Sequence, residues 1–419
     1  MPGTLSENRV LQIWQDRLSG RNDLVTEGGE PVRVVYPGRR NGDRGADFRD
    51  AVVAIGGGVT KGDIEVHVRS SGWRAHHHHR DPVYNRVVLH VVFRHDTTGD
   101  IILQNGKRVP TLALERFTDT AIPAAAHVLP CRKALRRRDA DFIGGVLDEA
   151  GERRFDAWVD EFGEEIARQG ASQSLYRGIM GALGYSKNKK PMLELAGRMP
   201  LKRLEAEIPK EMPDAECLEQ YRARLMGIAG LTASPHAGEY PVNSPERIWA
   251  DCRETATMSA DGWRFFKVRP ANSPVRRITA ICQLLVRYRE EGMIEGLMGV
   301  LEGAKNEDGW REMERTLTVE GDGCPALLGR ERAAVIVVNV LLPFAVARGR
   351  LESRPGLTVK AMEIYRSYPP LAENALQRHM ARQLGINRYV VSTARRQQGL
   401  LHIYKTLCSQ GGCRDCPLV

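Results

Sequence analysis

The sequence contains little that would place the protein in a membrane or outside the cell. Its first ten residues have neither the basic segment nor the apolar stretch of a secretory signal. The most apolar run, residues 333–347, is too short to cross a bilayer and contains Asn339 and Pro343. We therefore expect a buried, kinked helix at this run, no membrane association and a cytoplasmic protein.

Several common catalytic motifs are also missing. The glycines at 56–58 resemble a phosphate-binding loop, but no Gly-Lys-Ser/Thr follows them, so a turn explains them better. The sequence has no Gly-x-Ser-x-Gly elbow, no His-Glu-x-x-His motif and no dinucleotide-binding fingerprint. The enzyme classes that depend on these motifs are therefore not indicated.

Aromatic residues are scarce at 6%, but 42% of the residues are hydrophobic, which is enough for a folded core. At 419 residues the chain has room for two or three domains. Its formal net charge of +9 favours a polyanionic partner such as DNA or RNA. Basic side chains are concentrated at residues 131–138 and after Ala381.

The hydrophobic pattern changes along the chain. Apolar spacing predicts a helix over residues 5–20. Alternating or β-branched runs predict strands at 32–36, 48–55, 63–68, 86–93 and from 101. From about residue 123, apolar residues recur at helical spacing instead.

These patterns predict an α+β fold with three parts. Residues 1–121 form an α/β sheet domain with a candidate metal site, and residues 122–320 form a helical domain. Residues 321–419 form a helical C-terminal region with a cysteine cluster. The sequence does not indicate an oligomeric state.

The strand predicted at residues 63–68 carries polar side chains on one face. Side chains two apart on a strand point the same way, so Asp63, Glu65 and His67 share that face. Asp47 precedes the neighbouring strand, and a hairpin through the glycines would bring it near Glu65 and His67. We assign Asp63 to the turn before the strand and favour Glu65 and His67 as site residues. A solvated sheet face is the alternative explanation of the same alternation.

Histidines are concentrated around this strand. Seven of the eleven histidines lie within residues 67–95, four of them in a row at 76–79. Such crowding beside two carboxylates indicates a divalent-metal or phosphate site. The substrate-binding candidates are His78, Asp81, Tyr84 and His90. A solvated histidine loop and a hydrogen-bonded core position for His90 are the structural alternatives.

An acid at a strand start, a hairpin and then Glu-x-basic on the next strand resemble the core of the PD-(D/E)XK nuclease superfamily. In such a core two carboxylates bind Mg²⁺, which carries the attacking water, and the basic residue positions that water. The resemblance makes Asp47 and Glu65 ligands of Mg²⁺ or Mn²⁺, and makes Asp47, Glu65 and His67 the catalytic residues. His67 stands where a lysine is usual. Glu7, on the preceding helix, would supply an extra acid.

Three of the eight cysteines, Cys408, Cys413 and Cys416, lie within the last twelve residues. Their spacing indicates metal ligation, either of Zn²⁺ or of a [4Fe–4S] cluster. Cys324 is the expected fourth ligand, and His402 is the alternative. The cluster loosely resembles those that follow the helical domains of some DNA repair glycosylases and RecB-like nucleases. The remaining cysteines are interpreted as packing residues: Cys131, Cys217, Cys252 and Cys282.

Motifs along the chain are similar to those of a family of uncharacterised bacterial proteins. They are Gly-x-Asp-Phe at 45–48, Gly-Asp-Ile-Glu-Val-His at 62–67, a His-rich segment at 73–85, Val-Leu-His-Val-Val at 88–92 and Cys-Pro-Leu at 416–418. This resemblance carries no chemistry with it, so the expected function depends on the residues themselves.

The leading functional hypothesis is a metal-dependent, nuclease-like phosphodiesterase that acts on DNA or RNA. Its phosphate contacts would come from the basic segments at 132–138, 187–190 and 395–396, which makes binding sensitive to salt. The alternative is a non-enzymatic nucleic-acid-binding or scaffold protein whose cysteine tail holds a structural metal.

Overall fold

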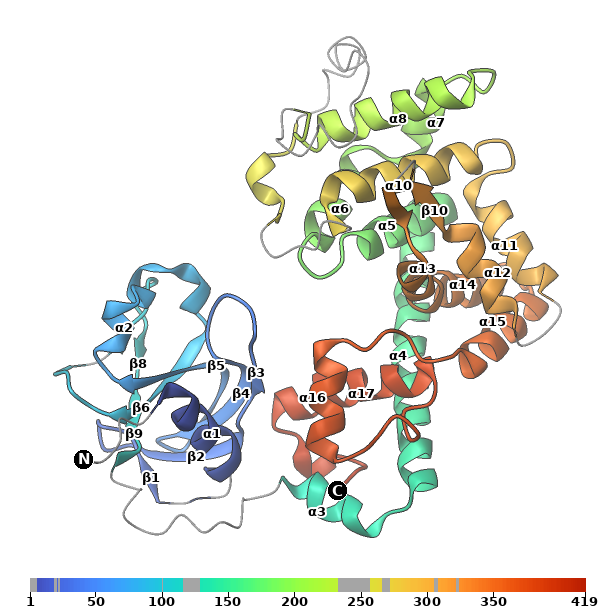
Figure 1. Cartoon of the computed structure of the whole chain (residues 1–419). Helices are drawn as coiled ribbons and strands as arrows, with labels where there is room; N and C mark the ends of the chain where they lie inside the picture. The colour runs from blue at the N-terminus through green and yellow to red at the C-terminus, as the bar shows by residue number, and fades with distance from the viewer. Residues whose placement is uncertain are drawn as a thin grey trace. The chain divides into compact units, whose positions relative to one another are not determined.

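The computed structural model describes residues 6–18, 21, 23–99, 101–115, 129–232, 257–265, 272–304, 308–321 and 324–419. The chain forms two compact units (Figure 1). The sheet unit comprises Met1–Gly151, Glu373–Val391 and Arg396–Val419, and the helical unit comprises Glu152–Ala372 and Ser392–Arg395. The helical unit is therefore inserted into the sequence of the sheet unit. These units divide the chain differently from the three segments expected from the sequence.

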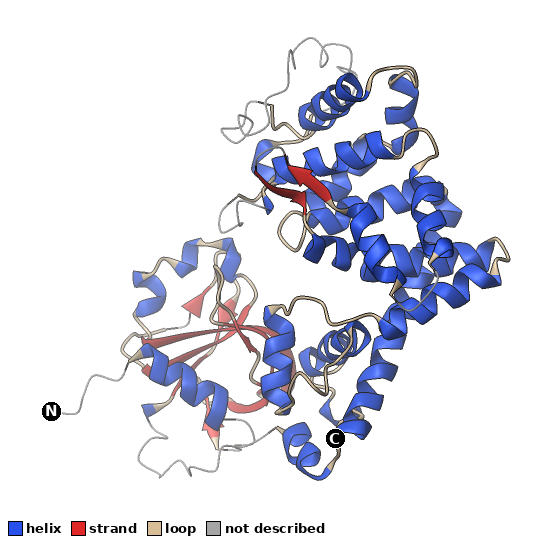
Figure 2. Cartoon of the chain, turned by 45° about the vertical axis from the view of Figure 1, so that its right-hand side comes forward, coloured by secondary structure: helices blue, strands red, loops and turns tan. Residues whose placement is uncertain are grey.

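The sheet unit contains a seven-stranded mixed sheet (Figure 2). Its strands are β1 (Leu24–Val25), β2 (Pro31–Tyr36), β3 (Arg39–Arg40), β4 (Phe48–Ile55), β5 (Gly58–Arg69), β6 (Val87–Arg94) and β9 (Thr111–Ala113). Their order is β1-β2-β4-β5-β6-β9, and β3 pairs with β4. The pairs from β1 to β5 are antiparallel, whereas β5/β6 and β6/β9 are parallel. The mixed α+β class predicted from the sequence is confirmed.

The run predicted as a strand from residue 101 lies outside this sheet. It forms β7 (Ile101–Ile102), which pairs with β8 (Arg108–Val109) in a separate two-stranded ribbon. The last strand of the main sheet is β9 instead. With three residues, β9 is too short to show a period of two in the sequence.

The hairpin between β4 and β5 turns at Gly56 and Gly57, whose φ angles are 58° and 88°. Strand β5 is longer than predicted and includes Asp63, so the assignment of Asp63 to a turn was wrong. The Asp63 amide donates to the carbonyl oxygen of Arg86 at 2.9 Å. A Cβ on Gly62 would lie 2.5 Å from that same oxygen, so glycine allows β6 to pair this close to β5.

Both faces of the sheet are covered within the sheet unit. On one face, α1 (Glu7–Arg17) packs through Val10 and Trp14 against a core that includes Val53. On the other face, Tyr36 and Val52 belong to a second core. That core is shared with α3 (Pro130–Ala134), the start of α4 (Ala140–Gln169), α16 (Ala375–Leu384) and most of α17 (Ala394–Thr406). Successive residues of β4 therefore face opposite cores, as expected for a strand buried on both sides.

Polar contacts also join the C-terminal segment to the sheet. The Tyr404 hydroxyl donates to Oδ2 of Asp50 at 2.9 Å, and Nζ of Lys61 donates to Oε1 of Gln410 at 2.6 Å. The segment after Glu373 is thus a structural part of the N-terminal sheet unit. The sequence predicted this C-terminal segment as a separate region, because the order of the residues does not reveal these contacts.

The helical unit has one continuous hydrophobic core. Its described elements are the rest of α4, α5 (Ala171–Leu183), α6 (Lys189–Arg198), α7 (Leu201–Glu207), α8 (Asp214–Ile228), α10 (Pro274–Arg287), α11 (Met293–Gly303), α12 (Gly309–Leu317), β10 (Val319–Gly321), β11 (Cys324–Leu328), α13 (Arg330–Ile336), α14 (Leu342–Leu351) and α15 (Pro355–Ser367).

The most apolar run of the sequence is buried in this core. Between α13 and α14 the chain forms a π-helical segment, Val337–Leu341, just before Pro343. Proline has no amide hydrogen for the carbonyl four residues back, and a π segment accommodates that lost bond. The stretch Arg330–Leu351 is long and apolar enough to span a membrane, but 72% of its most apolar window is buried, as in a core helix.

Candidate metal centre

The structure brings Asp47 and Glu65 together at the open end of the β4–β5 hairpin. The Asp47 amide donates to Oε2 of Glu65 at 3.1 Å, and the Val66 amide donates to Oδ2 of Asp47 at 3.0 Å. Each carboxylate is therefore held by the backbone of the other strand. This is the proximity expected from the hairpin.

Both carboxylates are largely buried. Burial raises the pKa of Glu65 to about 8, and burial together with the neighbouring Glu65 raises the pKa of Asp47 to about 7. Glu7, at the start of α1, adds a smaller negative potential at both groups. A cation between these groups would favour their charged forms, because it offsets both the burial and the mutual repulsion.

Three imidazoles surround the same place. Ring nitrogens of His67, His76 and His78 all lie within 4.8 Å of one another. Nε2 of His67 is 3.1 Å from Nδ1 of His76, and Nε2 of His78 is 3.0 Å from Oε1 of Glu65. Nε2 of His67 is 3.8 Å from that same carboxylate oxygen. The three imidazoles therefore form one group of donor atoms, and the Glu65 oxygen lies beside it, next to His67 and His78.

Short elements after β5 supply two of these donors. The chain leaves β5 through α2 (Gly72–Ala75) and then enters η1 (His78–Arg80). His77 takes a left-handed conformation, with φ of 60°, between the two helices. His76 is exposed while His67 and His78 are buried, so the group opens to solvent on the side of His76.

His90 lies behind the histidine group and orients the ring of His67. His90, on β6, pairs with Glu65 in the parallel register, and its Nε2 lies 2.8 Å from Nδ1 of His67. Burial lowers the pKa of His67 to about 2 and that of His90 to about 3, so both rings are neutral near pH 7. A neutral imidazole can bind a metal through one nitrogen while the other is oriented by a partner.

The remaining predicted residues occupy different positions. Tyr84 stacks on His78, with ring centroids 3.9 Å apart, and borders the group. Asp81 does not join it, because its carboxylate accepts from the Val83 amide at 3.0 Å and from Arg44 at 2.7 Å. His90 is fully buried beneath His67, so its contact is with that ring. The sequence does not distinguish His76 among the four consecutive histidines, because only the turn after α2 determines which of them faces the strand.

A strongly basic cavity of about 520 Å³ lies in the same unit. Five arginines line it: Arg39, Arg40, Arg132, Arg378 and Arg382. Positions 375, 378, 379, 382 and 383 of α16 share one face because they recur at helical spacing. Within the described part of the chain, none of the five guanidinium groups is paired with a carboxylate. The cavity is therefore chemically suited to an anion.

The cavity and the carboxylates are joined through β3. Arg40 pairs with Phe48 across the β3–β4 ladder, and the Asn41 amide donates to the Asp47 carbonyl oxygen at 2.7 Å. The positive charge of Arg40 also lowers the pKa of Asp47 against the effect of burial. The sequence places Arg132 in a basic segment, but it contains no signal that would connect β3 with α16.

The basic pair at 395–396 is already neutralised. Arg395 lies 2.8 Å from Glu152 within the helical unit, and Arg396 lies 3.1 Å from Asp148 within the sheet unit. These two side chains are therefore structural ion pairs, which disfavours the phosphate contacts expected of them.

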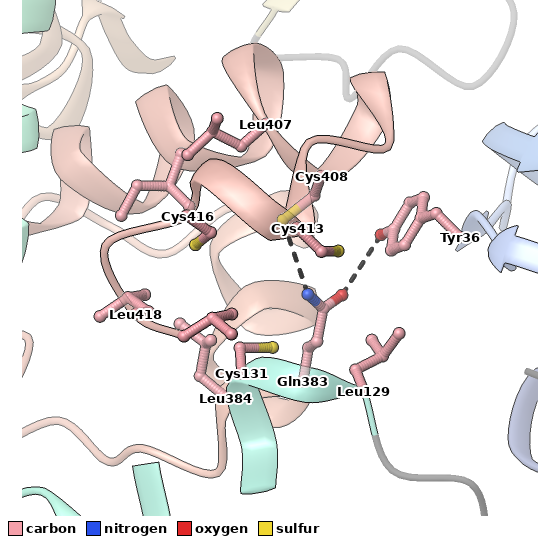
Figure 3. Close-up of a pocket in the computed structure, with 12 residues that line it drawn as sticks. Tyr36, Leu129, Cys131, Gln383, Leu384, Leu407, Cys408, Cys413, Cys416 and Leu418 are labelled. Carbon is pink, nitrogen blue, oxygen red and sulfur yellow. Dashed lines mark hydrogen bonds between the residues drawn. The ribbon is translucent and has the colours of Figure 1, made fainter. Parts of the chain in front are cut away.

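The three C-terminal cysteines also come together. Cys408, Cys413 and Cys416 line one pocket of the sheet unit, and Cys131 of α3 lines it with them (Figure 3). Cys324, the predicted fourth ligand, begins β11 in the helical unit, and its side chain lies outside the described set. His402 lies on α17, as expected.

The other cysteines have different surroundings. Cys217 and Cys282 are buried in the helical core, as predicted, and Cys252 lies outside the described residues. Cys131 is buried in the second core of the sheet unit, as predicted for a packing residue, and it also lines the pocket of the C-terminal thiols.

Residues 7–374 match the model of a family described as "Protein of unknown function (DUF2851)". The chain belongs to this family. The DUF2851 match includes the carboxylate–histidine group and Cys131, and it ends just before α16. No curated protein and no solved structure matches the chain. The family membership expected from the motifs is confirmed, whereas the nuclease resemblance gains no support from these comparisons.

Proposed function

We propose that this DUF2851 protein is a metal-dependent phosphodiesterase that acts on nucleic acid. The observation that carries the proposal is the donor set of Glu65, His67, His76 and His78, with Asp47 held against Glu65. Carboxylates and imidazoles grouped in this way are typical of a divalent-metal site in a hydrolase.

The donor chemistry narrows the choice of ion. Magnesium prefers oxygen ligands, whereas imidazole suits first-row transition metals. Of Mg²⁺ and Mn²⁺, the two ions expected from the sequence, three histidines and one glutamate favour Mn²⁺. Zn²⁺ is compatible with the same donors.

A divalent ion held by these residues supplies Lewis-acid chemistry: it polarises a phosphate oxygen and lowers the pKa of water. The chain's own residues supply the rest. Asp47, which lies against Glu65, would accept a proton from the attacking water in this proposal. His90 orients His67, and Tyr84 holds the ring of His78.

The arginine cavity supplies the substrate contacts in this proposal. Arginine binds phosphate oxygens through two parallel N–H donors, which gives both affinity and orientation. Strand β3 connects the cavity with Asp47 and Glu65, the two carboxylates beside which a phosphodiester would be cleaved. Such contacts fix the backbone and carry no sequence preference of their own.

The test is cleavage of labelled single-stranded DNA and RNA by the purified full chain with Mn²⁺, Zn²⁺ or Mg²⁺. We expect cleavage with Mn²⁺, a loss of at least about 100-fold in Glu65→Gln, and no change in Glu30→Gln, an exposed glutamate of the same unit. Equal cleavage by wild type and Glu65→Gln, or no cleavage with any of the three ions, would contradict the proposal.

The alternative is a non-enzymatic nucleic-acid-binding or scaffold protein. The arginine cavity favours it, because clustered guanidinium groups bind phosphate without any metal. Binding of DNA or RNA that survives in Glu65→Gln, together with an absence of cleavage in wild type, would select this alternative.

A further inference from the structure

Four cysteines from distant parts of the sequence line one pocket in the sheet unit. Cys131 comes from α3, Cys408 begins η9 (Cys408–Gln410), Cys413 begins η10 (Cys413–Asp415), and Cys416 follows directly. Figure 3 shows their side chains grouped beside Gln383 and Leu384. All four are free thiols.

The chain is shaped to bring the last three thiols together. Gly411 takes a left-handed conformation, with φ of 74°, between the two short helices. Its missing Cβ also allows a close approach to the sheet, because an added carbon would lie 3.1 Å from a methyl of Val52. The Gly412 amide donates to the Leu407 carbonyl oxygen at 3.0 Å, which folds the segment back on α17.

The rest of the pocket is mostly apolar. Its lining includes Leu129, Leu384, Ile403, Leu407 and Leu418. The polar side chains that line the pocket with the four thiols are those of Gln383 and Tyr36. Four sulfur ligands in one pocket are suited to a thiolate-bound metal group, either a zinc ion or an iron–sulfur cluster.

The distances between the thiols distinguish a zinc site from an iron–sulfur cluster. In a tetrahedral zinc site each sulfur lies about 2.3 Å from the metal, which places the sulfurs less than about 4 Å apart. Among the described residues, the histidine group is the one in which three ligand atoms all lie within 4.8 Å of one another. No three of the described thiol sulfurs meet this condition. The four thiols are therefore spread more widely than one zinc ion requires.

We propose that Cys131, Cys408, Cys413 and Cys416 ligate a [4Fe–4S] cluster. On ligation four S–H bonds break and four Fe–S bonds form to a preassembled cluster of iron and sulfide, and each new bond replaces the bond to a thiolate of the donor that delivers the cluster. The four protons pass to the four donor thiolates as they leave, and no electron is transferred in this exchange. The assignment is independent of whether the carboxylate–histidine group cleaves nucleic acid.

The position of the cluster gives it a structural role toward the arginine cavity. Nε2 of Gln383 donates to Sγ of Cys408 at 3.7 Å, and the Tyr36 hydroxyl donates to Oε1 of Gln383 at 3.3 Å. Tyr36 and Gln383 line both the cysteine pocket and the cavity. The cluster would thus hold the helix that presents Arg378 and Arg382.

The experiment measures iron, acid-labile sulfide and zinc in the full chain purified without oxygen, together with its visible absorption. We expect about four iron and four sulfide per chain and a broad visible band. Cys131→Ser and Cys416→Ser should lose more than half of the iron. Cys324→Ser and Cys217→Ser, the matched controls, should keep all of it.

Several outcomes would overturn the proposal. They are one zinc per chain without colour, no bound metal at all, or loss of iron in Cys324→Ser with retention in Cys131→Ser. Cys416 is only partly buried, so its variant remains informative if Cys131→Ser does not fold. Glu65→Gln should keep its full iron content, which separates this proposal from the phosphodiesterase activity.

Discussion

Oε2 of Glu65 accepts a hydrogen bond from the backbone amide of Asp47, with 3.1 Å between the two atoms. The main-chain amide of Asp47 therefore orients the carboxylate of Glu65. Oε1 of Glu65 is left to face His78, at 3.0 Å. The hairpin register that brings the two acids together thus also decides which carboxylate oxygen is available to an ion.

The first prediction concerns Gly72, which lies directly against His67. A Cβ at this position would lie 2.8 Å from Cδ2 of the His67 ring, closer than any normal contact. We expect Gly72→Ala to displace that ring and weaken Mn²⁺ binding by at least about tenfold, although no ligand is changed. Calorimetric titration with Mn²⁺ measures the effect. Gly145→Ala, on helix α4 of the same unit, where an added carbon meets nothing within 4 Å, is the control for the same substitution.

The second prediction tests the layer behind the ligands. His90→Leu removes the partner of Nδ1 of His67 but leaves all four donor atoms in place. Metal affinity should fall by about 10–100-fold, as it does when second-layer partners are removed elsewhere. His95→Leu, at a partly exposed histidine just after the same strand, should bind Mn²⁺ like wild type. Unchanged affinity in His90→Leu would show that His67 does not bind the ion.

The third prediction concerns the arginine cavity. Arg378→Gln combined with Arg382→Gln should weaken binding of single-stranded DNA and reduce its salt dependence. The slope of log K against log salt should fall by about 0.7 for each arginine that contacts a phosphate. Fluorescence anisotropy at several salt concentrations measures it. Arg388→Gln, on an exposed loop of the same unit, should leave the slope unchanged.

The fourth prediction is a pH dependence of stability that originates at His379. Burial and the nearby charges of Arg39 and Arg382 lower the pKa of His379 to about 4, and its Nε2 lies 2.7 Å from the Tyr36 hydroxyl. In the unfolded chain the pKa of this histidine is near 6.5, so the unfolded chain binds the proton first as the pH falls. The contribution of His379 to the free energy of unfolding is complete above about pH 6.5 and is lost between about pH 6.5 and pH 4.

Between pH 8 and pH 5 the free energy of unfolding should fall by about 2 kcal/mol because of His379. His379→Gln lacks the titrating group, so its stability should fall by correspondingly less over the same interval. Urea unfolding of both proteins at both pH values gives the difference, in which all other titrating groups cancel. An identical pH dependence in the two proteins would contradict the assignment.

The parts of the structure that depend on local sequence were predictable. The alternation in β5 and the turn at Gly56 and Gly57 are properties of adjacent residues, and they are sufficient to predict that Asp47 lies beside Glu65. The error at Asp63 has the same origin. Lys61-Gly62-Asp63 has the composition of a turn, but the pairing with β6, which requires glycine at 62, extends the strand through it.

What could not be predicted depends on contacts between distant segments. Nothing near Cys131 distinguishes a ligand from a packing residue, because its partners lie almost three hundred residues later. Arg39 and Arg40 likewise meet Arg378 and Arg382 only because α16 returns to the sheet. Such pairings have no period or motif, and a single sequence contains no signal for them.

The insertion of the helical unit also has a consequence for how the protein is made. Val52 and Met380 pack in the same core, but roughly 330 residues separate them. A ribosome adding about 5–20 residues per second needs roughly 15–65 s to cover that interval. During this time one face of the nascent sheet exposes Tyr36 and Val52 to solvent, while the helical unit can already close its own core. Newly made chains should therefore depend on chaperones at β2 and β4 until the last helices emerge.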